Sequence, residues 1–396
     1  MAHLILKPKA DRRLRNGHLW IYSNEVNVAK TPLQQFMHGQ QVDVLDHKGQ
    51  PLGTAMVNPQ QLICGRLVSR RADAPLGEAE LVQRLQRALE SREQLFAAHC
   101  YRWVYGDSDG LPGLVIDRFA DTIVIQISLA GMELLLEPLL TAINQVQPGL
   151  NILLKNDGKM RAVEGLEEYV RIAQGQVPEL VPLQENGVQF MAPVWHGQKT
   201  GWFYDHRLNR ARVQSLSKGK RVLDLFSYIG GWGIQAGAAG ASEVVCVDAS
   251  AQALELVHQQ AQLNGISERV QTIKGDAFAA LKQLKEAGEK FDVVILDPPA
   301  FIQRRKDIKS GELAYLRANQ LAMRLVADTG FLVSASCSMH LQRDRLVAIV
   351  NEASRKNGRH GQILEQGGQG GDHPIHPAIA ETDYLKSILV GVSPAL

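Results

Sequence analysis

The strongest constraint on the fold is a regular alternation of apolar and amphipathic segments that begins after Lys220. Five short apolar runs alternate with helix-like segments, a pattern typical of a parallel sheet covered by helices on both faces. We therefore predict an α/β fold with a doubly wound sheet. The predicted strands span residues 221–226, 243–248, 270–274, 291–297 and 330–337, and the predicted helices span about 230–240, 250–264, 276–288 and 310–328.

The preceding residues have a different pattern, and we predict two further domains there. Residues 1–73 contain short β-like runs separated by turn residues, which indicates a small β-rich barrel. Residues 74–183 mix helical and strand patterns, which indicates a central α+β domain. The third domain, residues 184–396, opens on an Asn186-Gly187 pair typical of a hairpin turn. Further strands are predicted at 41–46, 52–57, 62–68, near 104, 114–119, 122–128, 151–155, 361–366 and 384–392. Further helices are predicted at 78–99, 132–144 and 342–357.

Composition and cysteine spacing exclude several classes of protein. Apolar residues make up 45% and charged residues 21% of the 396 residues, as in ordinary globular proteins. No apolar run reaches the ~20 residues that cross a bilayer. The four cysteines form no C-x-x-C pair, which argues against a zinc site or a disulfide framework and favours a reducing, cytoplasmic location. His373 and His376 lack a third ligand, so we predict a structured loop and no metal.

The charge is unevenly distributed along the chain. The net charge of +2 combines +5 in residues 1–73, from ten Lys and Arg against five Asp and Glu, with −3 in the remainder. A basic module joined to a mildly acidic body favours a polyanionic partner, and a solvated basic face is the alternative. The oligomeric state is not indicated by any pattern in the sequence.

A glycine turn follows the first strand of the predicted sheet. Gly230, Gly231 and Gly233 allow the backbone to approach a ligand closely. A dinucleotide site places its glycines directly after the strand, facing a pyrophosphate. Here Asp224 occupies the end of the strand, where a carboxylate would repel pyrophosphate but would suit a cationic amino-acid group. This position argues against a dehydrogenase.

Two more acids follow the next two strands. Asp248 ends the second strand, where it can accept ribose hydroxyls, and Asp276 follows the third, where it can meet an adenine amino group. Each of these two alone could equally be a helix cap. Together with Asp224 and the glycine turn, they predict a pocket for S-adenosylmethionine at the carboxyl edge of the sheet.

The fourth strand ends in Asp297-Pro298-Pro299-Ala300-Phe301. Two prolines fix a rigid turn that would hold Asp297 beside the cofactor. A plain strand terminator would explain the prolines but not the acid and the aromatic residue. We predict a methyltransferase that acts on a base, with Asp297, Pro298 and Pro299 along its polar edge and Phe301 stacked on its face.

The fifth strand ends in Ser336-Cys337-Ser338 and should lie beside the fourth. An exocyclic amino group can attack a methyl sulfonium directly, whereas carbon 5 of a pyrimidine needs a nucleophile to add to carbon 6 first. Cys337 stands at the last position of the strand among polar residues, so we predict that it is the nucleophile rather than an inert core cysteine. Cys246 is predicted to be a core residue.

Two loops are further candidates for ligand contacts. Arg304, Arg305 and Lys306 follow the Asp-Pro-Pro turn and would meet the phosphates that flank a target nucleotide; a solvated loop is the alternative. The segment from Gln198 to Phe203 mixes polar and aromatic residues before the sheet. It would form a lid over the cofactor or pack the hairpin on the sheet.

Four motifs together resemble the bacterial large-subunit rRNA cytosine-carbon-5 methyltransferases. They are Asp-Leu-Phe-Ser-Tyr-x-Gly-Gly at 224–231, Gln-Lys-Thr-Gly-Trp-Phe-Tyr-Asp-x-Arg at 198–207, Leu-Asp-Pro-Pro-Ala-Phe at 296–301 and Ser-Cys-Ser at 336–338. The basic start of the chain is similar to the family's PUA module, an RNA-binding β-barrel. The resemblance covers nearly the whole chain and implies a Rossmann-like catalytic domain and 23S rRNA as the partner.

The resemblance also implies a role for individual residues. Cys337 matches the family's nucleophile. Asp297 matches the acid that lies beside the target base and holds its ring nitrogen 3. Some relatives carry a second cysteine where this chain has Pro299, so removal of the carbon-5 proton requires another base or a water. The cofactor-binding positions are Asp224, Phe226, Gly230, Gly231, Asp248 and Asp276, with Gln198 and Phe203 in the lid, and the PUA residues expected to contact RNA are Lys9, Arg12, Arg13 and Arg15.

Two other functions fit part of this pattern. An enzyme that methylates an exocyclic amino group would share Asp297-Pro298-Pro299 and an aromatic residue but would not need Cys337. A non-catalytic RNA-binding assembly factor would need neither the three acids nor the cysteine. The expected reaction is therefore methyl transfer from S-adenosylmethionine to carbon 5 of one cytosine in 23S rRNA through a covalent cysteine adduct.

Overall fold

The computed structural model describes residues 1–395, which form two compact units. The first unit comprises Met1–Leu183, Ala192–Tyr204 and Gly371–Thr382, and the second comprises Gln184–Met191, Asp205–Gly370 and, of the described residues, 383–395. Each unit is therefore built from segments that are far apart in the sequence. The predicted domain boundaries at residues 73 and 183 remain predictions.

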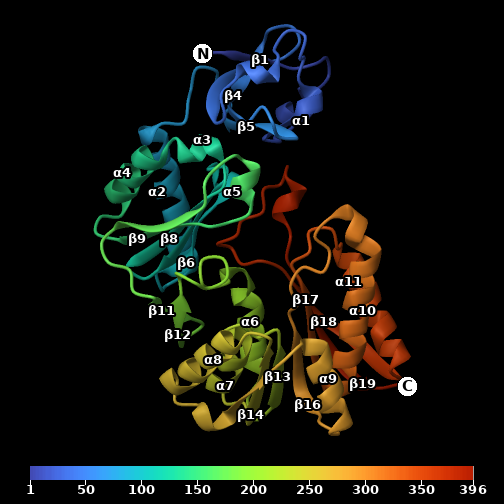
Figure 1. The fold of residues 1–396 in the computed structure, drawn as a ribbon. Coiled ribbons are helices and arrows are strands. Elements are labelled where there is room, and N and C mark those ends of the chain that lie inside the picture. The colour runs from blue at the N-terminus through green and yellow to red at the C-terminus, as the bar shows by residue number, and fades with distance from the viewer. Residues whose placement is uncertain (396) are drawn as a thin grey trace. The chain divides into compact units, whose positions relative to one another are not determined.

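The first unit begins with a five-stranded sheet in the order β1-β3-β4-β5-β2. This sheet belongs to the part of the ribbon drawn in blue in Figure 1. Its core consists of aliphatic side chains such as Leu6, Ile21 and Val44, which are fully buried. The predicted strands at 41–46, 52–57 and 62–68 are confirmed within a residue or two. The strands are β1 (His3–Ile5), β2 (Trp20–Tyr22), β3 (Gln40–Leu45), β4 (Pro51–Val57) and β5 (Ile63–Ser69), and α1 spans Arg12–Arg15. β1 and β2 are too short for their periodicity to be recognised.

A second sheet in the same unit has the order β10-β9-β8-β7-β6, with β8 and β9 parallel and the other pairs antiparallel. Helices α2 and α4 pack against one another beside this sheet, which confirms the expected α+β arrangement. Helix α2 ends at Leu95, four residues before the predicted end. The bounds are α2 (Glu78–Leu95), β6 (Cys100–Tyr105), β7 (Leu114–Phe119), β8 (Thr122–Ile127), α3 (Ala130–Glu133), α4 (Leu136–Val146), β9 (Asn151–Asn156), α5 (Met160–Val163) and β10 (Tyr169–Gln174).

A two-stranded hairpin precedes the sheet of the second unit. Its strands are β11 (Leu180–Glu185) and β12 (Val188–Pro193). Asn186 and Gly187 join them with φ angles of 52° and 80°, and this left-handed pair is the geometry that two-residue hairpin turns need. The predicted hairpin turn is confirmed.

The second unit contains a seven-stranded sheet in the order β15-β14-β13-β16-β17-β19-β18. Its first five strands are parallel, as predicted, and β17 is longer than expected because it begins at Val326. β19 runs antiparallel between β17 and β18, so the sheet is mixed at this end. The strands are β13 (Arg221–Leu225), β14 (Glu243–Asp248), β15 (Val270–Lys274), β16 (Phe291–Leu296), β17 (Val326–Ser336), β18 (Arg359–Gly367) and β19 (Lys386–Pro394).

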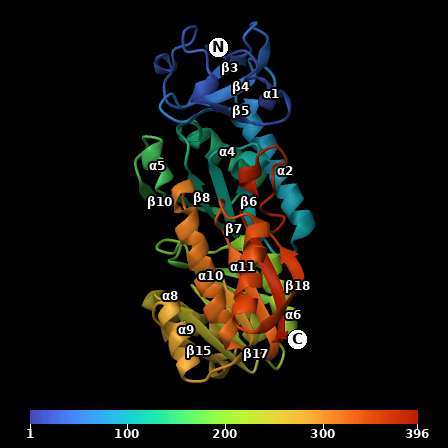
Figure 2. The same cartoon turned by 90° about the vertical axis from the view of Figure 1, so that its right-hand side faces the viewer.

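Helices cover both faces of this sheet, which explains why its strands are apolar along their length. Leu223 and Val245 pack into one core with α9, α10 and α11, whereas the alternate residues Asp224 and Cys246 face α7. Figure 2 shows α10 and α11 side by side along their length, in agreement with their extensive contact. The helices are α6 (Arg207–Leu216), α7 (Gly231–Ala238), α8 (Ala251–Leu263), α9 (Ala277–Glu286), α10 (Ile308–Leu325) and α11 (Arg343–Lys356).

Candidate active site

The carboxyl ends of four adjacent strands bring the main candidate residues to one edge of the sheet. Asp224 lies in β13, Asp248 ends β14, Asp297 directly follows β16 and Cys337 directly follows β17. The order β14-β13-β16-β17 makes these strands neighbours and confirms that β16 lies beside β17. The strand order reverses between the neighbouring strands β13 and β16, and ligands bind at such a point in open α/β sheets.

Asp224 is the most unusual acid at this edge. It is fully buried, and its Oδ2 accepts a hydrogen bond from the Gly233 amide at 2.8 Å. Its Oδ1 is buried without a hydrogen-bond partner among residues 1–395, and so is the hydroxyl of Ser227 in the following loop. Burial raises the pKa of Asp224 from 3.8 to about 8. A cationic ligand group at Oδ1 would restore the ionised carboxylate, because an opposite charge favours the charged form.

The loop after β13 has a strained backbone. Phe226 and Tyr228 adopt φ angles of +61° and +50°, in the left-handed region that non-glycine residues enter at a cost of about 1–3 kcal/mol. Gly230 follows with φ +85° and caps α7. At Gly233 a Cβ atom would lie 2.6 Å from the sulfur of Cys246, so a glycine is required where α7 packs on the sheet. Strain of this kind is concentrated at functional sites.

Asp248 and Asp276 differ in what they already bind. Asp248 accepts the Tyr228 amide at 2.8 Å and the Ser250 amide at 2.9 Å, and Ser250 rather than Asp248 caps α8. Asp248 therefore holds the loop after β13 in place. Asp276 is exposed and caps α9 by accepting the Ala279 amide at 3.1 Å. The capping alternative is thus confirmed for Asp276, and contact of either acid with a cofactor remains a prediction.

Asp297 has two partners that the sequence did not reveal. Its Oδ1 lies 3.2 Å from Nε2 of His206, and its Oδ2 accepts a hydrogen bond from the Trp232 indole at 2.9 Å. Burial would raise the pKa of Asp297, but the nearby His206 charge and the Trp232 hydrogen bond outweigh it and lower the pKa. Burial likewise would lower the pKa of His206, and Asp297 reverses this and raises it. The two groups form an ion pair.

Cys337 is only partly buried, whereas the other three cysteines are buried. Cys246 is fully buried in β14, as predicted, and burial raises its pKa well above the usual value. The serines on either side of Cys337 are buried and hydrogen-bond to the hydroxyl of Tyr315 on α10, at 2.8 Å each. The thiol therefore stands at the end of β17 on a fixed turn.

The residues after Asp297 divide into buried and exposed positions. Pro298 is buried and Pro299 is exposed. Phe301 is half-buried in an aromatic cluster, with ring centroids 4.8 Å from Tyr315, 6.2 Å from Phe278 and 6.3 Å from Phe226. One edge of the Phe301 ring thus contributes to packing, and its stacking on a base remains a prediction.

The basic residues expected to contact RNA also differ in their surroundings. Arg304, Arg305 and Lys306 are exposed, and Arg304 pairs with Asp307 at 3.2 Å. Near the N-terminus, Lys9 and Arg12 are exposed. By contrast, Arg13 forms an ion pair with Glu25 at 2.9 Å, and Arg15 forms ion pairs with Asp11 at 2.6 Å and Asp46 at 2.9 Å. Arg13 and Arg15 therefore have structural partners within the fold, and the RNA contacts of all these residues remain predictions.

The predicted lid segment belongs to the first unit. Within that unit, the Thr200 hydroxyl donates to Asp117 at 2.6 Å and the Tyr204 hydroxyl donates to the carbonyl of Arg118 at 2.8 Å. Gln198 is exposed and Phe203 is half-buried. These contacts anchor the segment, and its function as a lid remains a prediction.

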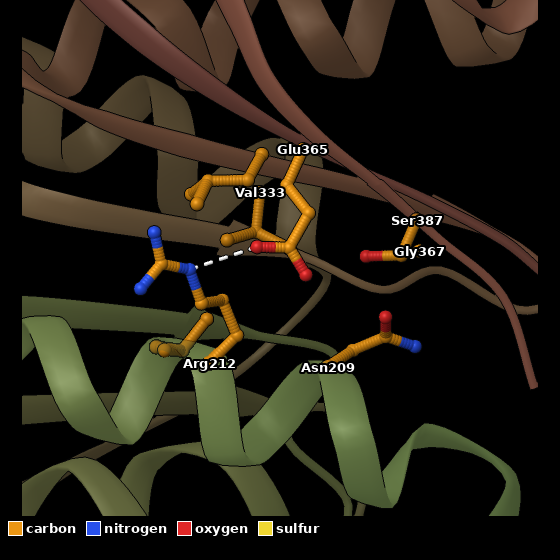
Figure 3. Close-up of a pocket in the computed structure, with 8 residues that line it drawn as sticks. Asn209, Arg212, Val333, Glu365, Gly367 and Ser387 are labelled. Atoms are coloured by element: carbon orange, nitrogen blue, oxygen red, sulfur yellow. Dashed lines mark ion pairs between the residues drawn. The ribbon is translucent and has the colours of Figure 1, made fainter. Parts of the chain in front are cut away.

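A small pocket lies between α6 and the strands β17, β18 and β19 (Figure 3). Arg212 and Glu365 face one another across it and form an ion pair at 2.8 Å. None of the predicted site residues lines this pocket. Within residues 1–395 the side chains form no cluster suited to a metal ion, and each helix is too short or too polar to cross a membrane.

Comparisons with known proteins agree with this geometry. Residues 4–70 match the PUA-like domain family, and residues 167–350 match the S-adenosylmethionine-dependent methyltransferase family. The chain is 36% identical over 386 residues to ribosomal RNA large subunit methyltransferase I of Aeromonas salmonicida, covering 96% of each chain. It is 32% identical over 390 residues to the protein of the same name from Shigella boydii, covering 97% of this chain and 98% of that protein.

Two solved structures share the fold over nearly the whole chain. One is a candidate SAM-dependent methyltransferase from Streptococcus mutans, with a TM-score of 0.84 and 20% identity, covering 99% of this chain and all of that one. The other is a candidate methyltransferase solved with SAH bound, with a TM-score of 0.85, 21% identity and the same coverage. The expected fold of a PUA-like β-barrel, a central α+β domain and a Rossmann-like sheet is confirmed, with the PUA-like part forming a half-barrel, and so is S-adenosylmethionine as the cofactor.

Proposed function

The chain belongs to the ribosomal RNA large subunit methyltransferase I family of S-adenosylmethionine-dependent enzymes, and from this premise we propose its reaction. It transfers a methyl group to carbon 5 of a cytosine in large-subunit (23S) rRNA. The substrate class follows the relatives' names. The target atom and the covalent mechanism are inferred from the residues at the sheet edge.

The observation that carries this proposal is the placement of Cys337 beside Asp297. Asp297 directly follows β16 and Cys337 directly follows β17, and these two strands are hydrogen-bonded neighbours. Cys337 is also the one cysteine of the four that is not buried. Methylation of an exocyclic amino group needs no thiol, whereas carbon 5 of cytosine becomes nucleophilic only after addition at carbon 6. A partly accessible thiol at this edge therefore favours carbon 5.

Residues around Asp224 fit the amino-acid end of the cofactor. The carboxylate has a buried oxygen without a hydrogen-bond partner among residues 1–395, and an ammonium group would supply both the charge and the donor that it lacks. Asp248 would accept the ribose hydroxyls and Asp276 the adenine amino group. When bound, S-adenosylmethionine supplies an electrophilic methyl group.

The chain's own residues then act on the base. The thiolate of Cys337 bonds to carbon 6, and the electron pair of the ring double bond becomes available at carbon 5, where the methyl group is accepted. Asp297, held as an anion by His206 and Trp232, would accept a hydrogen bond from ring nitrogen 3 once that nitrogen carries a proton. A water, or a base other than Pro299, would then take the proton from carbon 5. The electron pair of that carbon–hydrogen bond restores the ring double bond, and the carbon–sulfur bond breaks to regenerate the Cys337 thiolate. The target must leave the helix stack to expose carbon 6.

Product analysis of a cysteine variant tests this proposal. Wild type, Cys337→Ala and the control Cys100→Ala would be incubated with large-subunit rRNA and methyl-labelled S-adenosylmethionine, and the RNA digested to nucleosides. We expect 5-methylcytidine from wild type and from the control. Cys337→Ala should lose at least about a thousandfold in rate while keeping its affinity for SAH within about twofold. Labelled N-methylated nucleosides, or full activity of Cys337→Ala, would instead support the amino-group reaction.

A further inference from the structure

A buried lysine lies beside the turn that carries Cys337. Lys386 is the first residue of β19 and pairs with Ser336 of β17 in the antiparallel register. It is only 5% exposed. Its ammonium group donates hydrogen bonds to the carbonyl of Ser338 at 2.6 Å and to the carbonyl of Tyr384 at 2.8 Å. The lysine thus ties the backbone just before β19 to the backbone just after Cys337.

This environment is unusual for a lysine. A buried ammonium group is normally paired with a carboxylate, because burial of an unneutralised charge is costly. Among residues 1–395, Lys386 forms no ion pair with an Asp or Glu, and its two hydrogen-bond acceptors are neutral carbonyls. Burial accordingly lowers the pKa of Lys386 to about 8, while the charges of Cys337 and Asp383 act to raise it and that of Arg343 to lower it.

The other groups around the cysteine do not neutralise this ammonium. Tyr315 is fully buried, and burial raises its pKa, so it faces the turn as a neutral hydroxyl that bridges Ser336 and Ser338. Asp383 is exposed to solvent, where its charge is screened. Cys337 directly precedes Ser338, whose carbonyl the ammonium group binds, and the charge of its thiolate acts to raise the pKa of Lys386. The two charges would therefore stabilise one another.

We propose that Lys386 is a positioning residue that stabilises the thiolate of Cys337 and fixes the turn on which it stands. The inference rests on the proposed function, because it concerns how the nucleophile is activated. A cationic neighbour favours the anionic form of a thiol, and the thiolate is the form that adds to carbon 6. Two sets of hydrogen bonds hold this turn in place. One runs from Lys386 to the Ser338 carbonyl, and the other joins the Tyr315 hydroxyl to Ser336 and Ser338.

Alkylation kinetics test this inference without any methyl transfer. Iodoacetamide reacts with the thiolate, so the rate at Cys337 across pH 6–10, followed by peptide mass spectrometry, reports its titration. Cys64, Cys100 and Cys246 are buried and serve as internal reporters of unfolding. The variants are Lys386→Met and Lys386→Arg, with the exposed Lys285→Met as the control.

In Lys386→Met we expect the midpoint of alkylation to rise by at least about one pH unit and the rate at pH 7 to fall about tenfold. Lys386→Arg keeps the positive charge at every pH in this range, so its midpoint should stay at or below that of wild type. The control should match wild type. An unchanged midpoint in Lys386→Met would overturn the inference. If Lys386→Met unfolds, all four cysteines will react. The test then compares the alkylation midpoints of Lys386→Gln and Lys386→Arg, and equal midpoints would also overturn the inference.

The inference and the proposed function fail in different ways. If Cys337→Ala is inactive but the alkylation midpoint does not depend on Lys386, the inference alone is wrong. If Cys337→Ala still methylates RNA, the proposed function is wrong, whatever the alkylation profile shows. If the charge of Lys386 rather than its packing is the cause, Lys386→Met should lower kcat and leave the KM for RNA unchanged. Lys386→Arg should then restore kcat.

Discussion

Cofactor binding should release a proton from Asp224. In the ligand-free protein burial raises the pKa of this carboxyl from 3.8 to about 8. At about 1.4 kcal/mol per pKa unit, this shift means that burial disfavours the charged carboxylate by about 6 kcal/mol. At pH 6.5, about 1.5 units below this pKa, Asp224 is almost wholly protonated. An ammonium group placed at its unpartnered Oδ1 would reverse the preference and expel the proton.

The sign of the stability effect follows from the same pKa. Because the folded-state pKa lies above the unfolded value, the folded protein binds more protons than the unfolded chain between about pH 4 and pH 8. The contribution of Asp224 to the stability of the ligand-free protein is present below about pH 4 and is lost as the pH rises through about 8. Bound ligand should remove this part of the pH dependence, because the carboxylate is then paired at every pH in the window.

Calorimetric titration with SAH in buffers of different ionisation enthalpy measures the released protons. At pH 6.5 the amino group of SAH is itself protonated, since α-amino groups titrate at about 7.7 or above, so the signal belongs to the protein. We expect release of about one proton per SAH at pH 6.5 and loss of this release in Asp224→Asn. As the pH rises to 9 the release should decline through zero to net proton uptake, because Asp224 is then already ionised and the amino group of SAH must gain a proton to bind as ammonium. A binding enthalpy independent of the buffer at pH 6.5, or unchanged SAH affinity in Asp224→Asn, would refute the assignment of Asp224 to the cofactor's ammonium group.

Two other residue sets can be tested by binding measurements. Asp276→Ala should lower the free energy of unfolding by about 1 kcal/mol, because α9 loses its cap, and should weaken SAH binding, whereas Asp276→Ser keeps the cap. Urea unfolding measures the first effect and SAH titration the second. Unchanged SAH affinity in both variants would mean that Asp276 only caps the helix. Replacing Arg304, Arg305 and Lys306 by Ala should reduce the salt slope of RNA binding by about 2, at about 0.7 per phosphate contact. The control Lys282→Ala/Lys285→Ala should keep the wild-type slope, and an equal slope in the triple variant would contradict phosphate contacts there.

Local patterns in the sequence were sufficient for the central part of the fold. Strands that are buried on both faces form apolar runs, and the acids that end them stand out against these runs. Asp224, Asp248 and Asp297 could therefore be assigned to one edge of the sheet before the structure was known. The glycine turn at Gly230 was equally visible, because its left-handed backbone has a direct signature in residue type.

Contacts between distant segments could not be predicted in this way. Lys386 reaches the turn after Cys337 only because β19 inserts antiparallel between β17 and β18, and strand order leaves no local trace in the sequence. The pairing of His206 with Asp297 likewise joins residues that are far apart along the chain. One weak signal existed for the lysine: Lys386 is the single charged residue of β19, whose centre is apolar. Three-residue strands such as β2 were missed because they are shorter than any recognisable period.

The most direct test of the account is covalent trapping on RNA that contains 5-fluorocytosine. Fluorine at carbon 5 cannot be removed as a proton is, so an enzyme that adds a thiolate to carbon 6 becomes locked to its substrate after methyl transfer. The account predicts a complex that resists denaturant, forms only with S-adenosylmethionine present, and maps by peptide sequencing to Cys337. Formation of 5-methylcytidine on ordinary RNA without any trapped complex, or a bond to a residue other than Cys337, would contradict it.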